Sequence, residues 1–296
     1  MYKKQLLLTL LISGLLTLSF SGKKKPTAKS ALKVLTGFCS FIPSGTTQVD
    51  QESTTVQSFY MSSTEITNFQ YAEFLFDLEK NGELEKLAIA AIDTSAWLNV
   101  DSFSKSMVDY YHNHPAYHDY PVVNISKEAA ELYCTWLTGK YEELSGGELK
   151  IIFRIPTRAE WIHAASGGVQ MSPYSWGGPY LRGEKGLILA NFLRMGAENV
   201  ARDEESGEFK IVPNVFIAGS SNSDITAPAK SYFPNNYGLY NMNGNVSEMV
   251  SDGDLAAGGD WNSPGYDIRN QSIKKFENTD PTVGFRVVAT YLEKAK

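Results

Sequence analysis

The residues whose types and spacing most clearly suggest chemistry lie in one loop, residues 236–250, which reads NYGLYNMNGNVSEMV. Asn and Glu supply oxygen donors, and the glycines let the backbone bend so that its carbonyls turn inward. Such a set suits a hard cation such as Ca²⁺. Asn and Gly also favour plain turns, so a loop without an ion is the alternative. The pattern favours a cation-binding loop.

A second group of metal-binding side chains is the histidine cluster His112, His114 and His118. Imidazoles at this spacing could chelate a metal from a loop. Pro115 and the neighbouring tyrosines instead favour a polar loop with partly stacked rings. His163 lies in a predicted helix, where a structural role is favoured.

The two cysteines, Cys39 and Cys134, limit the thiol chemistry of the chain. An oxidising compartment would allow a bridge between them. Cys134 lies in an apolar helical pattern, which favours a buried free thiol. The pair is not in a C-x-x-C arrangement, so a two-cysteine redox enzyme is a poor fit.

The N-terminus has the features of a targeting segment. A short basic start precedes an apolar run over residues 5–20, and Ser19 and Ser21 stand at the −3 and −1 positions of a cut before Gly22. We therefore predict a signal peptide over residues 1–21; an uncleaved membrane anchor is the alternative, for which the run is short. No Cys stands at the cut site, and Cys39 lies too far downstream to serve as a lipid-attachment residue. We expect an exported protein, periplasmic, outer-membrane-associated or extracellular, with peripheral or no membrane association.

Composition points to one globular domain after that segment. The chain has 296 residues, of which 43% are hydrophobic, and this suits a single well-buried core. Its formal net charge of −6 argues against nucleic acid as a partner. We predict a flexible lead-in over residues 22–37, because Lys, Ser and Thr dominate it, and a folded domain over residues 38–296.

Regular elements are short and are marked by clear start signals. Apolar runs predict strands at residues 38–43, 58–61 and 120–126. Thr67, Ser126 and Thr157 are predicted helix N-caps, and Thr157 has the capping-box spacing to Glu160. Residues 195–226 are polar and irregular, which predicts a surface insertion. From Ala227 onward, Gly-, Asn- and Asp-rich turns predict short strands.

Several ordered motifs resemble those of the sulfatase-modifying-factor family, which contains the formylglycine-generating enzymes. They cover roughly residues 38–290 and are Phe59–Met61 with Thr64–Asn68, Tyr120–Ser126, Arg154–Trp161, Tyr174–Gly177, Tyr237–Glu248, Gly258–Asn262 and Gly284–Arg286. The resemblance implies an α+β domain, an elaborated C-type-lectin-like fold with low regular secondary structure. A narrower similarity links Phe59–Met61 and His114–Val123 to gliding-motility and type IX secretion lipoproteins of the Bacteroidetes type, although the lipid-attachment Cys of those proteins is absent.

The resemblance also implies which chemistry should be present. The enzymes of this family use a cysteine pair that binds copper, in the segment matching residues 260–269, and this segment contains no Cys. Other members are non-haem iron enzymes with a His cluster, but their H-x-x-x-H-x-E spacing is absent here. We therefore expect no copper and a non-catalytic member. Motif residues Arg154 and Arg286 are expected as internal struts and Arg269 as part of the former cleft.

Calcium is the cofactor that the resemblance implies. Asn241 and Glu248 would supply side-chain oxygens, and Gly244 and Val246 backbone carbonyls. A second site would use Asn191 and the carbonyl of Phe192, with Asp224 as the nearest acidic residue. The aromatic motif residues Trp161, Trp176 and Trp261 are expected to be core anchors rather than a ligand cage.

The leading functional prediction is an exported, calcium-stabilised, non-catalytic domain that binds protein partners in the cell envelope, as a scaffold of the type IX secretion or gliding machinery. A metal-dependent oxidoreductase using His112, His114 and His118 is the first alternative. A carbohydrate-binding, lectin-like module is the second, suggested by the fold alone, and fold does not fix function.

Overall fold

The computed structural model describes residues 26–100, 104–183, 186–193, 200–202, 206–211 and 225–292. The predicted signal peptide and Asp224 therefore lie outside the described residues, as does most of the predicted insertion. Of that insertion, β6 (Val200–Arg202) and β7 (Phe209–Ile211) form a two-stranded hairpin. No helix among the described residues is long and apolar enough to cross a membrane.

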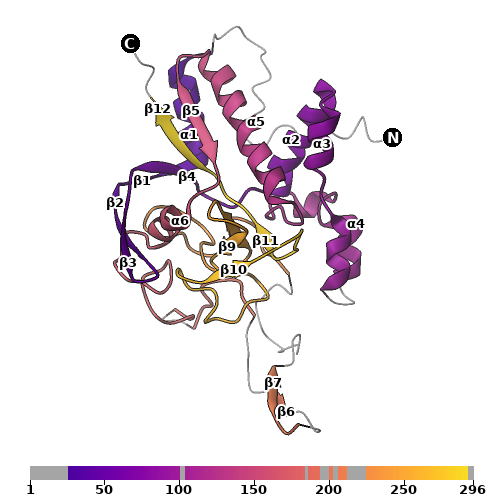
Figure 1. Ribbon diagram of the computed structural model, residues 1–296, viewed down its shortest axis with the longest axis vertical. Coiled ribbons are helices and arrows are strands. Elements are labelled where there is room, and N and C mark those ends of the chain that lie inside the picture. The colour runs from indigo at the N-terminus through magenta and orange to yellow at the C-terminus, as the bar shows by residue number, and fades with distance from the viewer. Residues whose placement is uncertain are drawn as a thin grey trace.

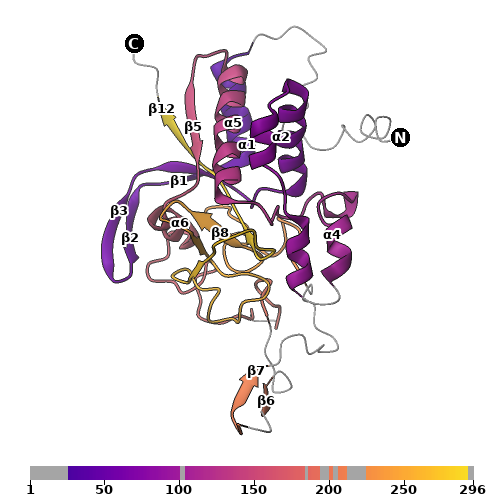
Figure 2. The same cartoon turned by 45° about the vertical axis from the view of Figure 1, so that its right-hand side comes forward.

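The lead-in is the first correction to the sequence-based prediction. Residues 28–38 form helix α1 (Ala28–Phe38), which starts with a capping box at Thr27 and buries Ala31 and Leu35. The helix lies beside α5 (Lys127–Ser145) in both views (Figures 1 and 2). The folded domain thus begins before residue 38, because the apolar face of this segment has a helix to pack on.

A four-stranded sheet lies against these helices, with the order β1-β4-β12-β5. All its pairings are antiparallel, and Met61 of β4 stands opposite Val288 of β12. The strands are β1 (Cys39–Ile42), β4 (Phe59–Ser62), β5 (Lys150–Arg154) and β12 (Val288–Leu292). Between β1 and β4 the chain extends into a second hairpin, β2 (Gly45–Val49) and β3 (Glu52–Val56), which curves outward (Figure 2).

A second small sheet, with the order β10-β9-β8-β11, holds the loop singled out from the sequence. Its strands are β8 (Ser247–Val250), β9 (Leu255–Ala257), β10 (Ile273–Lys275) and β11 (Val283–Gly284). Every residue of β8 is buried, so Glu248, the second residue of the strand, lies in the interior immediately after the loop. The predicted strand at residues 120–126 is absent; within it, Pro121 makes only an isolated bridge to Thr67.

The predicted helix starts are confirmed. Thr67 caps α2 (Asn68–Asn81), Ser126 caps α5, and Thr157 forms a capping box with Glu160 at α6 (Arg158–Ala165). The segment after α2 carries only short helical elements, including α3 (Leu84–Ile89) and α4 (Met107–Tyr110).

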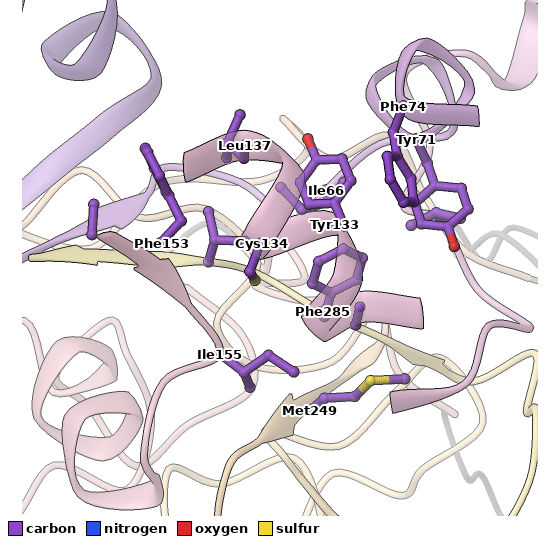
Figure 3. Close-up of a cluster of buried hydrophobic side chains, with 14 of the residues drawn as sticks. Ile66, Tyr71, Phe74, Tyr133, Cys134, Leu137, Phe153, Ile155, Met249 and Phe285 are labelled. Carbon is purple, nitrogen blue, oxygen red and sulfur yellow. The ribbon is translucent and has the colours of Figure 1, made fainter. Parts of the chain in front are cut away.

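The largest core cluster joins the helices to the first sheet. Tyr133 of α5 packs edge-on against Phe74 of α2 and against Phe285, with ring centroids 5.5 and 5.4 Å apart (Figure 3). Phe285 is the residue immediately before Arg286. The packing of α2 and α5 therefore fixes the backbone position of Arg286, whose side chain lies at the centre of the candidate site.

Candidate functional site

Arg286 and Glu248 form a fully buried ion pair at the centre of the domain. Their side chains are 0% and 1% exposed. The guanidinium Nε and Nη2 each donate to a Glu248 oxygen at 2.6 Å, and the Trp161 indole donates to the same carboxylate at 2.6 Å. Two further bonds run from Arg286 to the carbonyls of Ser62 and Tyr240. Arg286 is an internal strut, as expected, and both oxygens of Glu248 are already in use.

Glu65 is a second buried carboxylate in the same network. Its side chain is fully buried, and its two oxygens accept from the amide nitrogens of Asn245, at 2.8 Å, and Asn241, at 3.4 Å. Burial raises the pKa of Glu65 well above the usual range of a glutamate, and the nearby charge of Arg286 offsets part of that rise. In the sequence, Glu65 stood out only as a motif residue. An acid between the strand predicted at residues 58–61 and the predicted N-cap Thr67 was the available signal.

The two segments predicted to bind calcium lie against each other. The Asn245 amide donates to the carbonyl of Asn191 at 2.8 Å, and Asn191 Nδ2 lies 3.3 Å from Asn245 Oδ1. Gly244 has a φ of +74°, and a Cβ there would stand 2.1 Å from the Asn191 carbonyl oxygen. Only glycine fits this close approach. Loop 241–248 and Asn191 thus form one centre.

The fit of this centre to the implied calcium ligands is incomplete. The side-chain oxygens of Asn241 and Asn191 are buried without a hydrogen-bond partner among the described residues, which fits a cation. Glu248 does not fit, because Arg286 and Trp161 occupy its oxygens. The set Asn241, Gly244, Val246 and Glu248, with Asn191 and Phe192, stays a prediction.

Segment 260–269 forms a braced loop without a thiol. Asp260 is buried and accepts from Ser247 Oγ at 3.0 Å and from Lys274 at 3.3 Å. Trp261 is buried and donates to the Pro281 carbonyl. These contacts tie the loop to the second sheet and leave no nucleophile of the expected kind within it.

Cys39 and Cys134 are buried free thiols, as predicted for Cys134. Both belong to the large core cluster, where Figure 3 shows Cys134 among apolar side chains. Burial raises the pKa of both thiols far above the usual range, so neither forms a thiolate readily.

The histidines do not converge on a metal. His112 Nδ1 pairs with Asn68 Oδ1 at 3.0 Å, and burial lowers the pKa of His112 to about 3. His114 accepts from the Ala116 amide, and His118 packs on Phe69. In the described part of the chain, no three His, Cys, Asp or Glu residues are grouped so as to hold a metal. His163 is buried and bonds to the Pro43 carbonyl through Nε2, as a structural histidine does.

Exposed aromatic and apolar side chains stand on the 260–269 loop and on residues 171–183 and Leu187, in the segment that contacts it through Tyr174. Met171, Tyr180 and Tyr266 are 90%, 76% and 68% exposed. Tyr174 donates to the Gly265 carbonyl and so joins the two segments; Tyr174 and Trp176 stack at 4.7 Å within one of them, and Arg269 lies 3.4 Å above the Tyr266 ring within the other. We call this the aromatic loop surface; its members are Met171, Trp176, Tyr180, Leu187, Tyr266 and Arg269.

This surface was only partly anticipated from the sequence. Trp161 and Trp261 are core anchors, but Trp176 is only half-buried. Arg269, expected to line the former cleft, lies over the ring of Tyr266 in its own loop. Met171 and Tyr180 gave no periodic signal, since they stand in irregular loops.

The fold and these motifs agree with the comparisons with known proteins. The model of the sulfatase-modifying factor enzyme 1-like domain matches residues 19–291, and this chain belongs to that family. Its fold is the mixed α+β fold of the formylglycine-generating enzymes, with low regular secondary structure, as predicted.

Curated relatives and solved structures show the range of the family. The chain is 30% identical over 242 residues to a formylglycine-generating enzyme of Streptomyces coelicolor, covering 74% of this chain and 62% of the relative. It is 29% identical over 223 residues to the mouse enzyme, covering 67% of this chain and 50% of the relative. The chain thus spans only about half to three fifths of these relatives.

Two further matches are a solved structure and a curated relative. The crystal structure of CarF matches with a TM-score of 0.53 at 19% identity, over 84% of this chain and 97% of CarF, and shows the fold alone. A cattle relative named inactive Cα-formylglycine-generating enzyme 2 is 29% identical over 134 residues, 45% of this chain and 33% of the relative.

Proposed function

We propose that this chain is a non-catalytic member of its family that acts as a binding or scaffold component of a cell-envelope assembly after export. One observation carries the proposal: segment 260–269 has no cysteine, and the two cysteines of the chain are buried in the core with raised pKa values. Thiolate chemistry therefore lacks its reactants at the position that the resemblance assigns to it. The relative named as inactive supports the reading that family members can lose catalysis.

The aromatic loop surface supports the binding part of the proposal. Tyr, Trp, Met and Arg are enriched at protein interfaces, where a few such side chains supply most of the binding energy. Here they stand on the segment that the resemblance assigns to the active cleft and on the neighbouring segment that contacts it through Tyr174 and Gly265. A protein partner in the envelope is the occupant we infer, and the type IX secretion or gliding machinery is the assembly to search first, given the similarity of Phe59–Met61 and His114–Val123.

Affinity purification of the tagged chain from native envelopes tests this function. The double variant Tyr180→Ser/Tyr266→Ser removes two exposed rings of the surface. The control Phe41→Ser/Phe76→Ser removes two exposed rings from β1 and α2, each 54% exposed.

We expect the wild type and the control to recover a partner in stoichiometric amount. The tyrosine variant should recover at least about tenfold less, because each interface anchor contributes about 1–2 kcal/mol or more. A wild-type chain that is recovered alone would overturn the proposal.

Carbohydrate is the second candidate ligand, favoured by the exposed rings of Tyr180 and Tyr266. A glycan array with the same two double variants separates the candidates. Glycan binding that the tyrosine double variant loses and the phenylalanine control keeps would favour a lectin function over the scaffold function.

A further inference from the structure

The outer edge of β3, in the β2–β3 hairpin, has no strand beside it. The hairpin closes in a two-residue turn at residues 50–51, so alternate residues bond across its ladder and the others turn their N–H and C=O outward. Ser53 and Thr55 are outward residues of β3. The Gln48 carbonyl, opposite Ser53, bonds to the Gln271 side chain outside the hairpin, in agreement with this alternation. Among the described residues, no group bonds to the main chain of Ser53 or Thr55 on that edge.

A crevice of about 360 Å³ runs along this edge, a size within the usual range of ligand sites, about 300–1,000 Å³. Every residue from Thr54 to Phe59 lines it. Successive side chains of a strand point to opposite faces, so a space that touches all of these residues lies along the edge of the strand rather than on one face. The other lining residues are Arg154, Thr157, Ala159, Glu160 and Thr290.

The crevice opens where the hairpin and β12 diverge. β4 pairs with β12 only at Val288 and Ala289, whereas β5 accompanies β12 as far as Leu292. The chain before β4 leaves the sheet, and the hairpin curves away from it (Figure 2). Thr290, the first residue of β12 past its pairing with β4, lines the crevice. An extended segment beside β3 would therefore take the place that a neighbouring strand has inside a sheet.

The lining of the crevice favours an uncharged polar occupant. Most of its side chains carry hydroxyl or amide groups, and Val56 and Phe59, each 3% exposed, present little apolar surface. The two charged side chains, Arg154 and Glu160, already pair with each other through bonds of 2.6 and 2.5 Å. A charged segment would lose hydration in the crevice and gain no free counter-charge.

We propose that this crevice binds one extended segment of a partner protein, rich in small uncharged polar residues such as serine, threonine, asparagine and glycine, as an added strand on β3. Backbone bonds to Ser53 and Thr55 supply the affinity, and the hydroxyl-lined wall supplies the selectivity, as in other strand-addition complexes. Residues 52–56 include no proline or lysine, which commonly protect an exposed strand edge. The site shares no residue with the aromatic loop surface and goes beyond the proposed function.

Selection from a phage-displayed library of random twelve-residue peptides tests the site. The library is depleted on the Thr55→Pro variant of the full exported chain and then selected on the wild type. Thr55→Pro removes one outward N–H and leaves the ladder to β2 intact, because proline is tolerated where the N–H of an edge strand faces outward. The matched control Thr46→Pro makes the same change opposite Thr55, on the outer edge of β2. Thermal unfolding checks that both variants fold.

We expect the selected peptides to be rich in small uncharged polar residues. A fluorescein-labelled synthetic copy should bind the wild type and Thr46→Pro alike in fluorescence anisotropy. Binding to Thr55→Pro should be at least about tenfold weaker, because the peptide loses a backbone hydrogen bond and meets the proline ring. Ser53→Pro takes the place of Thr55→Pro if that variant does not fold.

Amide hydrogen exchange of the wild type tests the same edge without any variant. The free chain should exchange the Ser53 and Thr55 amides rapidly, and saturating peptide should slow both at least about tenfold. The Thr54 amide, inside the ladder, is the internal reference.

Three outcomes would each overturn the proposal: no enriched peptide, enriched peptides dominated by charged residues, or a bound peptide that leaves both amides unprotected. A dimer in analytical ultracentrifugation that Thr55→Pro abolishes would also overturn it and assign the edge to a second copy of this chain. None of these results bears on partner recovery through Tyr180 and Tyr266, so the two proposals fail independently.

Discussion

Arg286→Met removes the one guanidinium that compensates the buried carboxylates. The substitution keeps an apolar stem of similar length but deletes both bonds to Glu248 and those to the Ser62 and Tyr240 carbonyls. Because both partners are almost completely buried, water cannot replace these bonds. Glu248 must then take up a proton or remain charged without a partner.

The expected loss of folding free energy is about 3–5 kcal/mol, the usual cost of breaking a buried ion pair from one side. At about 2–4 °C per kcal/mol for a chain of this size, the melting temperature should fall by about 6–20 °C. Urea unfolding at pH 7 and calorimetry would measure both quantities.

The double variant Glu248→Met/Arg286→Met is the control for this reasoning. Removing both charges should recover at least about 1–2 kcal/mol relative to the single variant, because apolar side chains replace a buried pair at little cost. A single-variant loss below about 1 kcal/mol would refute the reasoning. So would a double variant whose loss equals the sum of the two single losses.

Three further predictions follow from single residues. Gly244→Ala should destabilise by about 3 kcal/mol or more in urea unfolding, because its Cβ meets a backbone oxygen, whereas Gly82→Ala, at φ +71° with nothing within 4 Å, should cost only about 1 kcal/mol; equal losses would contradict the packing argument. Burial raises the pKa of Glu73 to about 7, so its contribution to stability is present below its unfolded pKa of 4.5 and is lost as pH rises through 7. Glu73→Gln should therefore be near neutral at pH 4 and stabilise by about 1 kcal/mol at pH 8, after allowance for partial exposure, and a pH-independent effect would refute this. Cys39 and Cys134 should react with a thiol reagent at pH 8 only after denaturation, and rapid reaction of the native chain would show that the thiols are accessible.

Helix starts and strand runs could be predicted because their causes are local. Thr67, Ser126 and Thr157 satisfy backbone donors three residues away, and this is visible in the sequence. The prediction of a strand over residues 120–126 was wrong because a short apolar run does not show whether a partner strand is available. Helix α1 was missed because most of its residues suggest a polar segment and its apolar stripe is only three residues long. That stripe stabilises the helix only when it packs on α5.

The sequence named several residues of the buried centre but not their pairings. The motifs assigned Asn241 and Glu248 to one calcium site and Asn191 to a second, and the structure brings these segments together. The sequence could not show that Glu248 forms the ion pair with Arg286 while Glu65 bonds to Asn245. Both contacts join residues that are far apart in the chain. The aromatic loop surface was missed for the same reason, since its members come from two separate irregular segments.

The central claim, that this chain has lost the thiol chemistry of its family, is tested most directly by titrating the native protein anaerobically with Cu(I) against a competing chelator and then measuring oxygen uptake. The account predicts no stoichiometric Cu(I) binding and no uptake above the chelator blank. One equivalent of bound Cu(I) with oxygen consumption, both abolished by Cys39→Ser or Cys134→Ser, would contradict it.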